Sequence, residues 1–287
     1  MIELDVAESR SASRKSPRAG SAIGVLSLTK GGMEWGSIDG GGPRSVWSRV
    51  TQNQVGHEAC LNWGMTVGGQ DWWEWHKSMD DPTSALSRRL IAVQEAFRRG
   101  LDCCPQGPIR VISLCAGQGR DLIEVLSEHP RRADVRARLV EIDPRNVTFA
   151  RASADAAGLA DVEIVEADAG MTDAYAGAAP ADIVLCCGVF GNITGRDIER
   201  MVNAFPTLCS AAGLVIWTRN RLPPDLTPKI RIWFQEAGFQ EESFSIPAGT
   251  VFAVGAHRFV RDPRDFTPRY RLFDFVGYRQ ILGKPDR

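Results

Sequence analysis

The stretch Val111 to Leu122, VISLCAGQGRDL, decides the fold class of this chain. Its apolar first half predicts a parallel strand that is covered on both faces. Gly117 and Gly119 predict a tight turn in which no side chain keeps a ligand from the backbone. A helix follows, and its first amides have no partner inside the helix, so they can face a polar or anionic group. A strand, a glycine turn and a helix also occur without any ligand, and the next segments favour the ligand site.

Three further apolar segments end on polar residues or glycine. ARLVEIDP ends on Glu141 and Asp143, about twenty residues after the glycines, where a doubly wound fold places an acid for ribose hydroxyls. VEIVEAD ends on Asp168, and DIVLCCGVF passes through Gly188. Ala-rich helical segments alternate with these strands, which is typical of an open parallel sheet that binds its ligand at the carboxyl ends of the strands.

The second half of the chain completes the expected sheet. Residues 208–220 predict the end of a helix, a turn of small residues and then a fifth strand. Residues 229–239 predict a helix that ends at a glycine, and EESFSI and TVFAVGAHRFV predict two strands of a hairpin. We therefore expect an α/β fold: a Rossmann-like, doubly wound, mostly parallel seven-stranded sheet with an antiparallel C-terminal edge hairpin and an N-terminal helical lid. The expected divisions are an irregular arm over residues 1–70, the helical lid over 71–107, the ligand-binding core over 108–260 and an aromatic and arginine-rich tail over 261–287.

The glycine spacing separates two cofactor classes. A dinucleotide fingerprint has the form GxGxxG, whereas Leu122 stands at its third glycine here. The chain instead resembles the class I S-adenosylmethionine (SAM)-dependent methyltransferases over about residues 109–259, roughly half of its length. Ser113 stands where that family usually has an acid, and Cys115 stands where it has the first glycine, so this loop is a variant of the family's motif.

The resemblance implies SAM as cofactor and S-adenosylhomocysteine (SAH) as product. It implies that the glycine loop passes the amino acid part of SAM, that Glu141 holds the ribose and that Asp168 reads the adenine amino group. Asp143 competes with Glu141, and strand alternation favours Glu141. The cofactor-binding residues expected in this way are Cys115, Ala116, Gly117, Gly119, Glu141, Ile142, Asp168, Ala169 and Gly188.

The segment before the first strand offers candidates for the acceptor site. Trp72 and Trp75 either form an aromatic wall around a flat or cationic substrate or pack the lid onto the sheet. His76 is the candidate general base, because its ordinary pKa lies near neutrality. The further substrate-binding candidates are Phe190, Asn192, Arg219 and Asn220, with turn formation and surface solvation as the alternatives.

The fourth strand argues against several methyltransferase subclasses. CGVFGNI lacks the NPPY or DPPY of base amino-methylating enzymes, the paired glutamates of protein arginine methyltransferases and the magnesium-binding acid of catechol enzymes. The Pro-Cys or Thr-Cys context of cytosine C5 enzymes is also absent. The remaining expectation is methyl transfer to oxygen, nitrogen or carbon of a small molecule in secondary metabolism, without a metal site.

Composition agrees with an enzyme of this kind. The 287 residues are 44% hydrophobic with a net charge of -1, and seven cysteines show no CxxC pair, so we expect reduced, mostly buried thiols and a cytoplasmic protein. No apolar run is long enough to span a bilayer. We expect a small-molecule substrate, no nucleic acid, no membrane, and a monomer or homodimer. The alternatives are an RNA methyltransferase, for which the tail interleaves arginines and aromatics, a non-catalytic binding protein on the same fold, and a nicotinamide enzyme.

Overall fold

The computed structural model describes residues 70–277. The arm expected over residues 1–70 lies outside the described residues except for its last one. The expected tail over residues 261–287 is described as far as residue 277. Everything below concerns residues 70–277.

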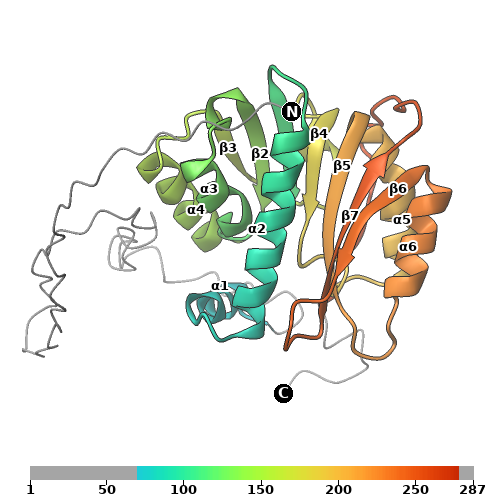
Figure 1. The fold of residues 1–287 in the computed structure, drawn as a ribbon, viewed down its shortest axis with the longest axis horizontal. Helices are drawn as coiled ribbons and strands as arrows, with labels where there is room; N and C mark the ends of the chain where they lie inside the picture. Colours follow the sequence, from blue (N-terminus) through green and yellow to red (C-terminus); the bar gives the residue numbers. More distant parts are fainter. Residues whose placement is uncertain (1–69, 278–287) are drawn as a thin grey trace, which may run out of the picture. The chain divides into compact units, whose positions relative to one another are not determined.

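One sheet of seven strands forms the centre of the fold (Figure 1). Its strand order is β3-β2-β1-β4-β5-β7-β6, and β7 alone runs antiparallel to both of its neighbours. The expected parallel sheet with an antiparallel pair at its C-terminal edge is confirmed. The strands are β1 (Ile109–Leu114), β2 (Val135–Glu141), β3 (Val162–Glu166), β4 (Ala181–Cys186), β5 (Cys209–Asn220), β6 (Phe239–Ser245) and β7 (Phe252–Phe259).

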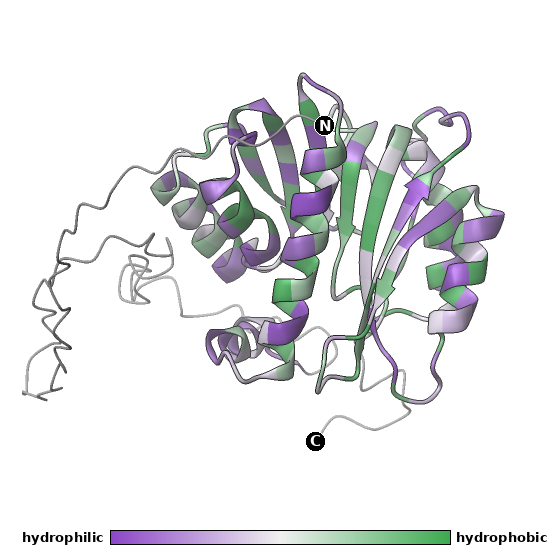
Figure 2. Ribbon diagram, viewed as in Figure 1, coloured by the Kyte–Doolittle hydropathy of each residue, from purple (hydrophilic) through white to green (hydrophobic). Residues whose placement is uncertain are grey.

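The apolar runs of the sequence become the central strands because both faces of the sheet are covered. Ile112, Leu139 and Ile183 are fully buried, and Figure 2 shows the hydrophobic strands between helices whose outer faces are hydrophilic. Ser113 pairs with Leu139 of β2 and Leu185 of β4, which places the whole of β1 in the middle of the sheet. The end of β1 therefore lies between the ends of β2 and β4.

Two helical layers cover the sheet. Val93 of α2, Leu122 of α3 and Val147 of α4 belong to the core on one face, and Ile198 of α5 and Phe234 of α6 to the core on the other. The helices are α1 (Trp72–His76), α2 (Ala85–Cys103), α3 (Arg120–Glu128), α4 (Pro144–Ala156), α5 (Gly195–Ala204) and α6 (Thr227–Glu236), with short 3-10 helices η3 (Lys77–Asp80), η4 (Arg132–Asp134), η5 (Thr172–Tyr175) and η6 (Phe205–Thr207).

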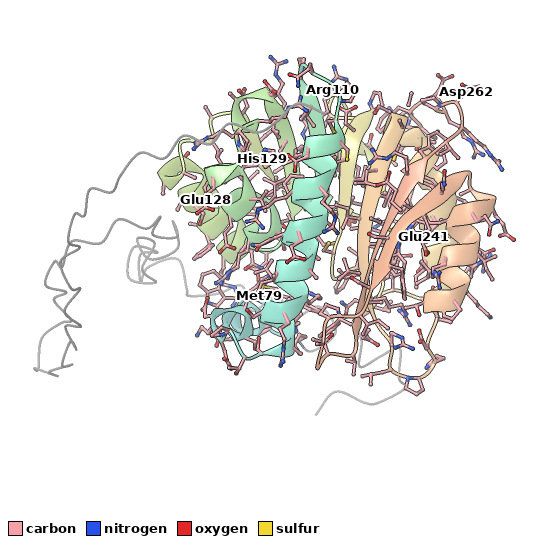
Figure 3. The ribbon with its side chains drawn as sticks, in the orientation of Figure 1. Met79, Arg110, Glu128, His129, Glu241 and Asp262 are labelled. Atoms are coloured by element: carbon pink, nitrogen blue, oxygen red, sulfur yellow. The ribbon has the colours of Figure 1, made fainter. Side chains whose placement is uncertain are left out.

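The segment expected to form a helical lid divides into two parts. The amphipathic helix is present as α2, begun by the side chain of Ser84, which accepts a hydrogen bond from the amide of Ser87. Phe97 and Leu101 are fully buried, so α2 is a layer of the core. Only α1 and η3 lie beyond the ends of the strands; Figure 3 shows Met79 of η3 far from Arg110 at the start of β1.

The described part of the tail packs on the core of the protein. Leu272 and Phe273 are buried. The amide of Leu272 donates to the carbonyl of Gly170, and the amides of Val276 and Gly277 donate to the carbonyl of Asn192. We call residues 270–277 the C-terminal strap, because they join the loop after β3 to the loop after β4.

None of the helices described is both long and apolar enough to cross a membrane.

Candidate functional site

The glycine loop joins β1 to α3 through a run of left-handed backbone. Cys115, Gly117 and Gly119 have φ angles of 48°, 56° and 67°. The amide of Ala116 donates to the carbonyl of Val140, so the loop is fixed to the end of β2. Glycine adopts such angles without strain, whereas the cysteine side chain carries a cost.

Gly119, expected to contact the cofactor, does not line the cavity. A Cβ atom there would lie 2.8 Å from the side chains of Ile123 and Leu139. Its missing side chain therefore allows α3 to approach β2, which is a packing role. Gly117 lines the cavity as expected.

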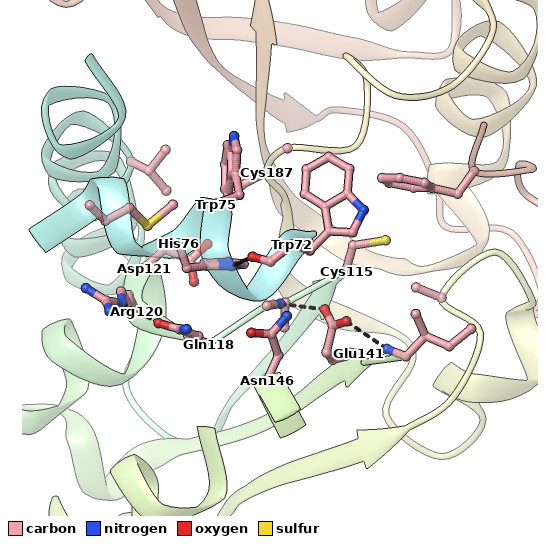
Figure 4. A pocket seen from close by; sticks show the side chains of 18 of the residues that line it. Trp72, Trp75, His76, Cys115, Gln118, Arg120, Asp121, Glu141, Asn146 and Cys187 are labelled. Carbon is pink, nitrogen blue, oxygen red and sulfur yellow. Dashed lines mark hydrogen bonds between the residues drawn. The ribbon is translucent and has the colours of Figure 1, made fainter. Parts of the chain in front are cut away.

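Glu141 at the end of β2 faces the glycine loop. Its Oε2 accepts a hydrogen bond of 2.7 Å from the amide of Gly117, and its Oε1 accepts from the amides of Ile142 and Asp143 at 3.0 and 2.8 Å. Burial raises the pKa of this carboxyl group, while the three amide donors oppose that shift. Figure 4 shows the carboxylate between the loop and the next residues of the chain.

Asp143, the competing acid, has a different place. Its side chain accepts from the amide of Arg145 and so begins α4. It also forms an ion pair of 2.6 Å with the guanidinium of Arg145. The same guanidinium forms an ion pair of 2.9 Å with Asp71, the N-cap residue of α1. Asp143 is absent from the cavity lining, whereas Glu141 is part of it.

His76 lies against the glycine loop and is buried. Its Nδ1 donates to the carbonyl of Trp72 at 2.6 Å, and a Cβ atom on Gly117 would lie 2.3 Å from its Nε2. Burial lowers the pKa of His76 to about 4, so the ring is neutral at physiological pH and a weak base. This arrangement fits a side chain that seats α1 on the loop.

A cavity of about 350 Å³ opens at this edge of the sheet. The rings of Trp72 and Trp75 meet edge to face at 5.6 Å, and Trp72 meets Phe275 of the strap in the same way at 5.4 Å. Both expected tryptophans thus line the cavity and also pack the lid. The lining includes the expected residues Cys115, Ala116, Gly117, Glu141, Ile142, Asp168, Ala169 and Gly188.

Asp168, the acid expected after the third strand, also lines this cavity. Its Oδ1 accepts from the amide of Gly170 at 2.8 Å, and its Oδ2 pairs with Arg271 at 2.6 Å. Arg271, Phe273 and Phe275 of the strap line the cavity, a contribution that the sequence analysis missed. The strap is about one hundred residues from Asp168 in sequence, so no local pattern could have indicated the pairing.

Two further polar residues of the cavity were also missed. Asp121 in the first turn of α3 and Asn146 in the first turn of α4 line it. Oδ1 of Asp121 and both amide atoms of Asn146 are buried without a hydrogen-bond partner among the described residues. Burial raises the pKa of Asp121 to about 6. The available signal was their position, since each directly follows the turn that ends an apolar strand.

A second cavity of about 220 Å³ adjoins the first. Asn192, Arg219 and Asn220 line it, so three of the expected substrate residues come together. The side-chain Nδ2 of Asn192 donates to the carbonyl of Gly188 at 2.6 Å, and the guanidinium of Arg219 donates to the carbonyl of Phe190. Both cavities are lined by Trp72, Trp75, Arg89 and Gly188.

Phe190, also expected to bind substrate, is in neither lining. It is fully buried and lies 5.8 Å from Trp217, ring centre to ring centre. Contrary to the expectation, the structure places Phe190 in the hydrophobic core with Trp217 and Phe234. The thiol of Cys186 is likewise in the core, while Cys187 lines the first cavity with a pKa raised by burial.

No protein-family model and no curated protein sequence matches the chain. Solved structures do. An O-methyltransferase family protein from Burkholderia thailandensis is 19% identical at a TM-score of 0.50, over 63% of this chain and 58% of that one. Magnesium protoporphyrin IX methyltransferase from Synechocystis, solved with bound SAM, is 12% identical at a TM-score of 0.52. That alignment covers 67% of this chain and 92% of the Synechocystis chain. The chain has the class I methyltransferase fold.

A third similar structure carries a different description. It is named a possible exported protein from Bordetella parapertussis and is 16% identical at a TM-score of 0.54, over 68% of this chain and 81% of that one. The alignment with the Burkholderia protein spans less than two thirds of that protein's length. At these identities the comparisons establish the methyltransferase fold predicted from the sequence, and the activity is inferred from the site.

Proposed function

We propose that the protein transfers the methyl group of SAM to a small-molecule acceptor. One observation carries the proposal: several residues that line the first cavity have buried polar atoms without a protein partner. Among the described residues these atoms include Trp72 Nε1, Asp121 Oδ1 and both amide atoms of Asn146. Buried polar groups are nearly always hydrogen-bonded, so this cavity suits a ligand that carries many polar groups.

The residues that line the first cavity offer groups that would suit each part of SAM. Glu141 and Asn146 offer acceptors and donors to ribose hydroxyls beside the glycine loop. Asp121 offers a carboxylate to the α-ammonium group, and Ile142 and Phe273 offer apolar contact to adenine beside Asp168. The carboxylate of Asp168, which pairs with Arg271, would also accept a hydrogen bond from the adenine amino group.

The charge of the cavity also suits a cationic cofactor. SAM carries a sulfonium, an ammonium and a carboxylate, which sum to one positive charge. The lining offers one more carboxylate than guanidinium, from Asp121, Glu141, Asp168 and Asp274 against Arg89, Arg120 and Arg271. A nicotinamide dinucleotide, with its anionic pyrophosphate, is less well matched.

The second cavity is the proposed acceptor site. SAM supplies a methyl group that is already activated on its sulfonium. The protein then has to hold the acceptor atom in line with that methyl group and keep water away, which supplies much of the rate. Trp72 and Trp75, which border both cavities, would exclude water at the junction. No dedicated base is required, and the acceptor proton passes to solvent; we place His76 among the positioning residues.

The test is transfer of labelled methyl groups. The full chain is incubated with methyl-labelled SAM and either the small-molecule or the RNA fraction of a host extract, and SAH is quantified. We expect label in small molecules with the wild type and with Arg99→Gln, a change at an exposed position of α2, and none with Glu141→Gln. Label in RNA alone, or no SAH above the level formed without extract, would overturn the proposal. An acceptor identified in this way also decides between oxygen, nitrogen and carbon, and tests a role in secondary metabolism.

A further inference from the structure

Arg89 is a buried cation at the junction of the two cavities. Only 7% of the residue is exposed, and it lines both cavities. Its guanidinium carbon lies 5.1 Å from the ring centre of Trp75 and 5.2 Å from that of Phe252. Both rings stabilise the positive charge, and neither supplies an oxygen acceptor to the N–H edge of the guanidinium.

That edge has no protein partner within residues 70–277. Arg89 makes no hydrogen bond and no ion pair there, and its Nε is buried. Asp121 acts on it electrostatically without reaching ion-pair distance. A buried guanidinium that lacks a counterion is costly, and its planar donor edge matches a carboxylate in two parallel hydrogen bonds.

The second cavity is electropositive. Its charged lining residues are Arg89 and Arg219, and no aspartate or glutamate of the described chain lines it. Trp72, Trp75 and Phe252 give it flat aromatic walls. Phe252 packs on Arg89 and lines this cavity but not the first. One of the two aromatic contacts of the guanidinium therefore belongs to the proposed acceptor site.

We propose that the acceptor is a planar aromatic acid whose carboxylate binds the N–H edge of Arg89. This inference rests on the proposed function, because it names the substrate class of the same site. The shared chemistry is a carboxylate, and SAM carries one too. The experiment must therefore distinguish an Arg89 that binds the acceptor from an Arg89 that binds the cofactor.

The test uses the full chain saturated with SAH, titrated calorimetrically with hydroxynaphthoate and with its neutral amide, hydroxynaphthamide. We expect the acid to bind at least about tenfold more tightly than the amide in the wild type and in the control Arg99→Gln. Arg89→Gln should abolish this preference while leaving the Kd for SAH within about twofold, which also shows that the variant is folded. Arg89→Lys keeps the charge without the planar fork and should retain part of the preference.

Three results would overturn the inference. The acid and the amide bind equally, or neither binds the SAH-saturated wild type. Alternatively, Arg89→Gln weakens SAH by about tenfold or more and the preference for the acid persists, in which case Arg89 serves the cofactor. A wild type that does not bind SAH at all is a different failure, since it contradicts the proposed function before the acceptor is added.

Discussion

The amide of Gly117 donates a 2.7 Å hydrogen bond to Oε2 of Glu141. This bond joins the glycine loop after β1 to the end of β2, which are neighbours in the sheet and distant in sequence. Oε1 of the same carboxylate accepts from two more amides. Glu141 thus fixes the loop while remaining part of the cavity lining.

Glu141→Gln should weaken both the loop and the cofactor site. Glutamine has a single carbonyl oxygen, so its NH₂ group would meet an amide N–H on one side. We expect a loss of about 1–3 kcal/mol in the free energy of unfolding and a Kd for SAH raised at least about tenfold. Urea unfolding and calorimetry measure the two effects. Glu166→Gln, at the exposed neighbouring position on β3, is the matched control, and equal effects of the two changes would contradict this account.

Asp121 makes stability and cofactor binding depend oppositely on pH. Its pKa is about 6 in the folded protein and 3.8 ordinarily, so the fold keeps a proton that the unfolded chain releases. The stability that this proton provides is complete below pH 3.8 and is lost as pH rises through 6. Asp121→Asn should therefore raise the free energy of unfolding at pH 8 by about 1–3 kcal/mol.

The same residue should bind the α-ammonium group only when ionised. Wild-type affinity for SAH is expected to fall as pH drops through about 6, and Asp121→Asn is expected to bind weakly at every pH. Asp161→Asn, at an exposed position, should change neither property. A variant that binds SAH as the wild type does, with the same pH profile, would remove Asp121 from the site.

His76 and Gly117 should be energetically coupled. Gly117→Ala would place a Cβ atom 2.3 Å from Nε2 of His76, on a backbone with φ of 56°. In a His76→Ala background the clash disappears and only the backbone strain, about 1–2 kcal/mol, remains. A double-mutant cycle of unfolding free energies should show a coupling of about 1 kcal/mol or more. Strict additivity would mean that the ring does not seat α1 on the loop.

At position 115 we expect the glycine variant to be more stable than the alanine variant, the reverse of the usual order. At most positions glycine is the less stable of the two. With φ at 48°, Cys115→Gly relieves left-handed strain that Cys115→Ala keeps, while both variants lose the thiol. Thermal or urea unfolding should find the glycine variant more stable by about 1 kcal/mol. The reverse order would show that the loop relaxes away from this conformation in solution.

The sequence predicted the fold, and it predicted that the residues at the carboxyl ends of the strands would line one cavity, because both follow from local patterns. Each apolar strand ends at the same edge of the sheet, so Gly117, Glu141 and Asp168 had to converge once the strands were identified. Asn192 and Asn220 reached the second cavity for the same reason.

The missed residues depend on long-range packing. No residue near Asp168 in the sequence indicates that Arg271 pairs with it. Phe190 is in the core and Asn192 lines a cavity, and only the path of the turn after β4 decides this difference. Arg89 did leave a local signal: it stands three residues after Leu86 and four before Val93, on the apolar face of α2. A charged residue on the apolar face of a helix indicates a buried charge that needs a partner.

The most direct test of the central claim is a calorimetric titration of the full chain with SAH, with NAD as the comparison. We expect saturable binding of one SAH per chain with a Kd of about micromolar order, weaker binding by Glu141→Gln, and no heat with NAD. Absence of SAH binding, or saturable binding of NAD in its place, would contradict it.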